Sequence, residues 1–293
     1  MTGTLIHSMA EFEAIIIDTL VCAGARHIVE IGAEYGGMSQ LLAAHAADAG
    51  GSLTSIDPAP KPEFVHWADS NPHVRHLAFP SLEIMPQLRA ADAWVIDGDH
   101  NYYTVYHELM NADRLCRRDR TPLLALLHDV SWPAARRDLY YAPDRIPDEW
   151  RHPHCWDSGV TLDSPEIVRH RGFRGMGQFA VATHIGGPRN GVLTAVEDFR
   201  ATQQAAGRAL AWAEIPAVFG LGILFDTDAP WSADLANRLH LYHGNPLIAA
   251  LEANRLRNYL AVLDWQDGFT GAPSLAAPAC ADRPTPLPAV PVN

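Results

Sequence analysis

Lysine is nearly absent from this chain, and long apolar runs are missing altogether. Lys61 is the only lysine, and the formal net charge is −12 at pH 7. No basic cluster offsets this negative charge, so we expect no nucleic acid among the partners. No apolar run approaches the length of a membrane span, and no basic segment followed by an apolar run opens the sequence. We therefore expect neither a membrane partner nor a signal peptide.

Cysteine patterns are also lacking. The four cysteines, Cys22, Cys116, Cys155 and Cys280, are widely spaced and match neither a zinc motif nor a disulfide framework. We therefore expect a reducing, cytoplasmic location. Hydrophobic residues make up 48% of the chain, which is ample for the core of one large domain or of one domain with additions.

The most informative stretch covers residues 26–42. It begins with the short apolar run 28–31, which is typical of a buried parallel strand. Gly32, Gly36 and Gly37 follow, and apolar residues then recur at helical spacing. Such a turn lets a ligand approach the backbone at the carboxyl end of a strand. The spacing G-x-x-x-G-G is neither the dinucleotide fingerprint nor a phosphate loop, which disfavours a nicotinamide dehydrogenase.

Strand and helix patterns alternate on both sides of this turn. Strands are predicted over 28–32, 53–57, 74–78, 93–97 and 123–127. Helices are predicted over 9–23, 37–49, 63–71 and 103–115. Later, a helical face over 192–199 precedes two apolar runs, 210–215 and 220–225, that we interpret as a closing hairpin. Regular alternation of this kind predicts an α/β fold with a doubly wound parallel sheet of seven strands.

The pattern also predicts how the chain is divided. Residues 1–129 and 190–226 form the core, and residues 130–189, which show little periodicity, are predicted to be an insertion over the active-site end of the sheet. Amphipathic helices are expected over 231–268, packing on the core or on a second subunit of a homo-oligomer. Residues 271–293 are rich in proline and alanine and are predicted to be a disordered tail.

A second acidic position makes the pattern more specific. Asp57 follows the strand that ends at Ile56, where a carboxylate can bind the hydroxyls of a ribose. Together, the glycine turn and this acid resemble the class I S-adenosylmethionine (SAM)-dependent methyltransferases, which have a Rossmann-like seven-stranded sheet. The resemblance implies SAM as the cofactor. By motif match it assigns cofactor binding to Glu30, Gly32, Ala33, Tyr35, Gly36, Gly37, Asp57 and Asp97.

Polar residues end the fourth and fifth predicted strands. The fourth strand runs into Asp97-Gly-Asp99-His100, and the fifth runs into His128-Asp129. Neighbouring strands of a doubly wound sheet bring such residues together at one edge. Carboxylates and imidazoles that converge there can bind a divalent cation.

These two motifs resemble one branch of the family, which includes macrocin- and novobiocin-type sugar O-methyltransferases. There, acids at the ends of strands four and five hold magnesium. The matching positions are Asp97 or Asp99, together with His128 and Asp129. His128 stands where the sugar enzymes have an aspartate. A neutral imidazole suits a transition metal better than magnesium, and it leaves His128 free to act as a general base.

The resemblance thus predicts methyl transfer from SAM to a small-molecule substrate, most simply at oxygen and with or without a metal. Catalytic roles are assigned to His128, His100 and Asp97. Simpler structural roles stay open, since Asp97 can close a turn and His100 can pack against the following helix. Two other functions also stay open: transfer to carbon or nitrogen, for example on a keto acid, and a SAM-binding module without catalysis.

Overall fold

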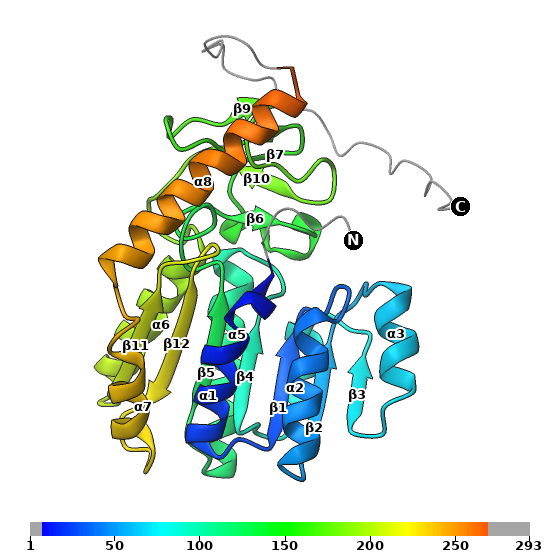
Figure 1. Cartoon of the computed structure of the whole chain (residues 1–293), viewed down its shortest axis with the longest axis vertical. Helices are drawn as coiled ribbons and strands as arrows, with labels where there is room; N and C mark the ends of the chain where they lie inside the picture. Colours follow the sequence, from blue (N-terminus) through cyan, green and yellow to red (C-terminus); the bar gives the residue numbers. More distant parts are fainter. Residues whose placement is uncertain (1–7, 269–293) are drawn as a thin grey trace.

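The computed structural model of the chain describes residues 8–268. Its largest element is a seven-stranded sheet with the order β11-β12-β5-β4-β1-β2-β3 (Figure 1). The strands are β1 (His27–Ile31), β2 (Ser52–Ile56), β3 (Val74–Leu77), β4 (Ala93–Ile96), β5 (Leu124–His128), β11 (Leu210–Ile215) and β12 (Leu221–Asp226). β12 runs antiparallel to β5 and β11, and the other neighbours are parallel. The predicted sheet is therefore confirmed.

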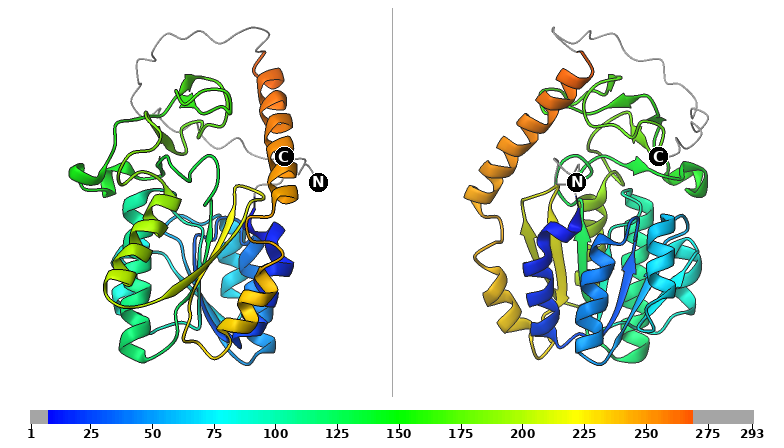
Figure 2. Two further views of the ribbon diagram at one scale, coloured as in Figure 1. Left: turned by 90° about the vertical axis from the view of Figure 1, so that its left-hand side faces the viewer. Right: turned by 45° about the vertical axis from the view of Figure 1, so that its right-hand side comes forward.

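Helices cover both faces of this sheet, as the left view of Figure 2 shows. The α-helices are α1 (Glu13–Ala23), α2 (Gly37–Asp48), α3 (Pro62–Asp69), α4 (Ser81–Ile84), α5 (Tyr102–Asp119), α6 (Val192–Ala205), α7 (Ser232–Leu239) and α8 (Pro246–Gln266). Of these, α8 lies above the sheet, beside the inserted region (Figure 1). Short 3-10 turns occur at Met9–Phe12, Met85–Gln87, Pro143–Arg145 and Asp148–Trp150. The apolar residues of α1, α2 and α7 pack on one face, and those of α5 and α6 pack on the other.

β5 shows how the sequence produces this double covering. Its five residues are all buried, without the polar alternation of a half-exposed strand. Leu124 and Leu126 join the core under α1 and α2, and Ala125 and Leu127 join the core under α5 and α6. Successive side chains of β5 point to opposite faces of the sheet, so this one strand contributes apolar residues to both cores.

Residues 130–189 lie between β5 and α6, above the carboxyl ends of the parallel strands (Figure 1). They contain β6 (Leu139–Tyr140), β7 (His154–Cys155), β8 (Ser158–Gly159), β9 (Val168–Arg169) and β10 (Ala180–Ala182). These form a three-stranded sheet, β6-β10-β7, and a two-stranded sheet, β8-β9. Strands of two or three residues are too short to leave a period in the sequence, which explains why none was predicted.

The helix boundaries differ from prediction at a few ends. α5 continues to Asp119, because the arginines of its last turn face solvent and do not interrupt the helix. At its start, the Asn101 side chain accepts a hydrogen bond from the Thr104 amide at 2.9 Å and caps the helix. The C-terminal region forms the two helices α7 and α8. The predicted disordered tail, residues 271–293, lies outside the described residues.

Two further predictions concern the described part of the chain. None of its helices is both long and apolar enough to span a bilayer. Its three cysteines, Cys22, Cys116 and Cys155, are unpaired. Cys280 lies outside the described residues.

Candidate active site

The glycine turn sits directly against the end of β4. Gly32 has φ +90°, and a Cβ placed on it would lie 2.1 Å from the Asp97 carbonyl oxygen. Gly36 has φ +82°, and a Cβ there would lie 2.8 Å from the Phe64 ring. Both positions combine a backbone conformation that favours glycine with a space that only glycine fits. The turn therefore brings β1, β4 and α2 to one point at the carboxyl edge of the sheet.

Gly36 is the N-cap residue of α2, and no side chain among residues 8–268 caps the first amides of this helix. Uncapped amides at a helix N-terminus favour an anionic ligand group, such as a carboxylate. Tyr35 is 59% exposed beside the turn, and the Lys61 ammonium lies 5.5 Å from its ring centre.

Asp57 joins the turn to the loop after β2. Its Oδ2 accepts hydrogen bonds from the amides of Ala33 and Glu34, at 2.9 and 3.0 Å. Its Oδ1 accepts from the Ala59 amide at 2.8 Å. The carboxylate predicted to bind a ribose therefore also fixes the shape of the glycine turn.

Glu30 lies at the end of β1, fully beneath this turn. Its Oε2 accepts hydrogen bonds from the hydroxyls of Ser39 and Ser55, at 2.7 and 2.6 Å. Its Oε1 is buried without a hydrogen-bond partner among residues 8–268. Burial raises the pKa of Glu30 to about 7, against the effect of the two hydroxyls. The side chain supports the turn from inside and does not reach solvent.

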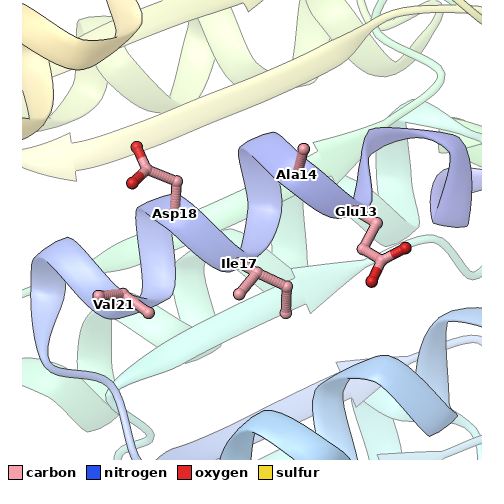
Figure 3. Close-up of a pocket in the computed structure, with 5 residues that line it drawn as sticks. All are labelled: Glu13, Ala14, Ile17, Asp18 and Val21. Atoms are coloured by element: carbon pink, nitrogen blue, oxygen red, sulfur yellow. The ribbon is translucent and has the colours of Figure 1, made fainter.

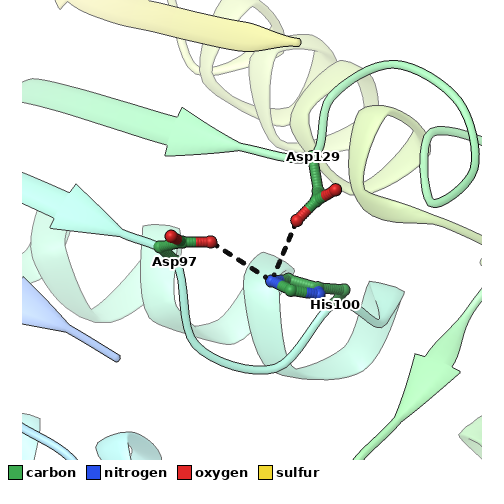
Figure 4. A group of neighbouring side chains, drawn as sticks. All are labelled: Asp97, His100 and Asp129. Carbon is green, nitrogen blue, oxygen red and sulfur yellow. Dashed lines mark hydrogen bonds and ion pairs between the residues drawn. The ribbon is translucent and has the colours of Figure 1, made fainter. Parts of the chain in front are cut away.

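Four side chains meet at the ends of β4 and β5, and Figure 4 shows three of them. His100 Nε2 lies 3.3 Å from Asp97 Oδ1 and 3.2 Å from Asp129 Oδ2. His128 Nδ1 lies 3.1 Å from Asp97 Oδ1 and 3.3 Å from Asp129 Oδ2. One ligand atom each of Asp97, His100 and Asp129 fall within 4.8 Å of one another, which is close enough to hold one metal ion. The convergence predicted from the two strand ends is thus present.

His128 is held from its other side by the turn between β11 and β12. Its Nε2 lies 2.8 Å from the Val218 carbonyl oxygen, which can only accept, so Nε2 carries a proton and donates it. The side chain is 3% exposed. Val218 and Phe219 both have positive φ, 43° and 65°, a conformation that is unfavourable for a β-branched residue. The strained turn therefore fixes the ring of His128.

This arrangement requires a positive charge in the cluster. With Nε2 protonated, a neutral His128 would point the lone pair of Nδ1 at two carboxylate oxygens. Either a second proton or a cation must lie between them. Burial opposes protonation, but the charges of Asp97 and Asp129 outweigh it and raise the pKa of His128 well above its usual value. For His100, the same opposing effects leave the pKa raised to about 9.

Asp97 and Asp99 have different surroundings. Asp97 belongs to the cluster; burial raises its pKa, but the charge of His128 reverses this and the net shift is downward. The Asp99 carboxylate instead accepts from the Tyr141 amide at 3.2 Å, and burial raises its pKa to about 6. Of the two acids that the motif offered, only Asp97 faces His128.

The inserted region is tied to this same loop. The Leu139 amide donates to the His100 carbonyl at 3.0 Å, and the Tyr102 amide donates to Asp138 at 2.7 Å. Tyr141 follows β6, its side chain is 41% exposed, and its ring meets the ring of His100 edge-on at 5.8 Å. The sequence did not single out Tyr141 or Val218. Tyr141 lies in a region without periodicity, and Val218 acts through its backbone.

The histidines of the insertion do not join the cluster among the described contacts. His152 packs against His184, with ring centres 4.7 Å apart, and His154 packs against Trp156 at 6.4 Å. Asp157 pairs with Arg169. These side chains hold the insertion together.

Residues 29–130 match the model of a methyltransferase domain family. This segment begins in β1 and ends just after β5, so it contains the glycine turn, Asp57 and all four cluster residues. A search of curated proteins found no match.

Solved structures with a similar arrangement include several methyltransferases. An O-methyltransferase from Bacillus cereus in complex with S-adenosylhomocysteine (SAH) is 16% identical, with a TM-score of 0.44, over 75% of this chain and 83% of that one. An O-methyltransferase from Streptomyces achromogenes involved in tomaymycin synthesis is 16% identical, with a TM-score of 0.43, over 77% and 83%. A Podospora anserina methyltransferase bound to SAH is 13% identical, with a TM-score of 0.42, over 74% and 78%.

The domain match and the site coincide in the chain. Each of the residues predicted to bind the cofactor or to carry the chemistry falls within the matched segment, at the carboxyl edge of the sheet. Residues 29–130, which match the model of a methyltransferase domain family, therefore contain the whole candidate site.

Proposed function

We propose that this chain transfers the methyl group of SAM to an oxygen atom of a small polar molecule. The observation that supports this most is the contact of Gly32 with the backbone of Asp97. Because of this contact, the glycine turn lies directly beside the cluster of acids and histidines. A methyl donor in the turn and an acceptor at the cluster would be neighbours, and positioning alone supplies much of the acceleration of such a displacement.

The cofactor would use groups already present at this edge. The uncapped amides of α2 suit the carboxylate of the methionine part of SAM. Asp57 stands at the end of β2, where an acid accepts hydrogen bonds from ribose hydroxyls. Its existing bonds to the turn then couple the two halves of the cofactor site.

We also propose that Asp97, His100 and Asp129 hold a divalent ion, with His128 Nδ1 adjacent to two of these ligands. Asp97 and Asp129 pair with the two histidines, and a cation between them would supply the positive charge that otherwise requires a second proton on His128. Mixed carboxylate and imidazole donors suit manganese or zinc better than magnesium. A bound ion of this kind would lower the pKa of an acceptor hydroxyl.

The remaining side chains then have separable roles. Asp97 is the most exposed member of the cluster, at 26%, so it is the carboxylate that a substrate can reach. His128 is buried and bonded on both sides, so positioning of the cluster suits it better than proton transfer to a substrate. Tyr141 forms a wall beside His100 from the inserted region, where it can contact the acceptor.

The metal part of this proposal can be tested by calorimetric titration of the metal-free protein with manganese. We expect one ion per chain, no detectable binding to Asp97→Asn or Asp129→Asn, and unchanged binding to Asp69→Asn. Asp69 is an exposed carboxylate at the end of α3 and serves as the matched control. Equal binding by all four proteins would refute the metal site.

The methyl-transfer part needs a separate readout. Titration with SAH should show binding to the wild-type protein, and a panel of small hydroxylated molecules should include one that SAM methylates only when the cluster is intact. SAH binding with no methyl transfer to any acceptor, at any metal concentration, would favour a non-catalytic SAM-binding module.

A further inference from the structure

Helix α8 has two apolar sides, and residues 8–268 cover only one of them. Its inner side packs against the inserted region and the β11–β12 turn through Leu256, Tyr259 and Leu260, which are all buried. Its outer side carries Leu247, Leu251, Val262 and Trp265, which are 67%, 62%, 40% and 80% exposed. Figure 2 shows α8 at the edge of the molecule, beside the inserted region.

The outer residues form one stripe along the helix. At 3.6 residues per turn, Leu247, Leu251, Asn254, Asn258, Val262 and Trp265 fall on one face, opposite Leu256. The stripe is about 27 Å long at 1.5 Å per residue. Along α8, which the structure describes in full, Arg257 is the only exposed residue that is charged. A helix side that faces water normally carries many more charges.

The stripe has a pattern that identifies its occupant. Its residues are arranged almost symmetrically about position 256: Leu247 mirrors Trp265, Leu251 mirrors Val262, and Asn254 mirrors Asn258. A two-fold axis near position 256 would therefore place apolar residues against apolar residues and asparagine against asparagine, so the stripe complements itself.

We propose that α8 pairs antiparallel with α8 of a second copy of this chain. Leucine then meets tryptophan at each end, Leu251 meets Val262 of the partner subunit on either side of the axis, and the asparagines meet at the centre. Asn254 Oδ1 accepts from Asn258 Nδ2 within the helix at 3.0 Å, which leaves further amide groups free to bond across the axis. Buried asparagines at such positions fix the register and orientation of paired helices.

The pairing also bears on the site. The inner side of α8 holds Arg171 and Arg174 of the insertion through Asp264 and Asp267. Its Glu252 accepts from the Phe219 amide at 3.1 Å, next to the carbonyl that holds His128. A dimer through the outer side would stiffen the helix that supports both the insertion and the turn. The inference itself does not depend on the proposed activity.

Solution mass gives the first test. Light scattering across protein concentrations should give twice the 32.1 kDa of one chain. Leu251→Asp places a charge in the stripe twice per dimer and should weaken association by about 100-fold. The matched control is Val21→Asp, which charges a similarly exposed apolar residue, 60% exposed, that lines the shallow pocket on α1 (Figure 3). It should leave the dimer intact, and circular dichroism should show both variants folded.

Cross-linking tests the direction of pairing. In an oxidised mixture, Leu251→Cys and Val262→Cys chains should form a disulfide-linked heterodimer, and each variant alone should form far less homodimer. A monomer at every concentration would overturn the proposal, and so would a dimer that Leu251→Asp leaves intact. Efficient linkage of Leu251→Cys with itself would also overturn it, because it would show parallel pairing.

Discussion

Replacing Gly32 by alanine is a stringent test of how the turn and the cluster are joined. A Cβ at this position would lie 2.1 Å from the Asp97 carbonyl oxygen and 2.9 Å from Gly98 Cα. All three nearest atoms belong to the backbone, so no side chain can rotate to make room. The chain must move β1 and β4 apart, or move the turn away from the sheet.

Two costs add up in this variant. Placing a residue with a Cβ at φ +90° costs about 1–2 kcal/mol. Overpacking against rigid neighbours costs about 1–3 kcal/mol more. We therefore expect Gly32→Ala to lower the free energy of unfolding by about 2–5 kcal/mol and to abolish measurable SAH binding. Urea unfolding and calorimetric titration with SAH measure the two effects separately.

Gly50→Ala is the control, because it also has a positive φ, +70°, but lies after α2 and has no atom within 4 Å of a new Cβ. We expect only the conformational cost of about 1–2 kcal/mol and SAH binding like that of wild type. If Gly32→Ala behaved like Gly50→Ala, the close contact between turn and cluster would be refuted.

Three further predictions follow from the site. Burial raises the pKa of Glu30 in the folded state from 4.5 to about 7, so the folded protein loses stability as pH rises between these values. In urea unfolding, the wild-type protein should lose about 3 kcal/mol of unfolding free energy between pH 4.5 and 8, and Glu30→Gln should not show this loss. The same pH dependence in both proteins would contradict the raised pKa. His128→Asn should weaken manganese binding by about 10–100-fold while SAH affinity stays unchanged. An unchanged manganese affinity would show that His128 does not support the metal site. Tyr141→Ala should raise the KM for the acceptor without changing SAH affinity, and an unchanged KM would show that Tyr141 does not contact the acceptor.

The sequence predicted the central sheet well, because its signals are local. β1, β4 and β5 are apolar runs bounded by glycine, proline or acids, and such runs indicate buried parallel strands; β2 is a short strand that ends before Asp57. Asp97, His128 and Asp129 could be placed together because neighbouring parallel strands end at one edge. His100 was expected there as a catalytic group, and the structure places it among the atoms that could hold a metal.

Other features of the site had no local signal. The strands of the insertion are two or three residues long, so the position of Tyr141 beside His100 depends on contacts with the loop after β4. The bond from His128 to Val218 joins residues 90 positions apart and uses a backbone oxygen. No residue type marks a carbonyl in advance, so sequence patterns cannot predict this contact.

The most direct test of the central claim is thermal unfolding of the wild-type protein with SAH. At about one hundred times its dissociation constant, SAH should add about 2.7 kcal/mol to the free energy of unfolding and raise Tm by several degrees. NADH in parallel should give no shift, because the glycine spacing does not suit a dinucleotide. A shift with SAH alone would support a SAM site in the glycine turn, and no shift with SAH would contradict the methyltransferase function proposed for this chain.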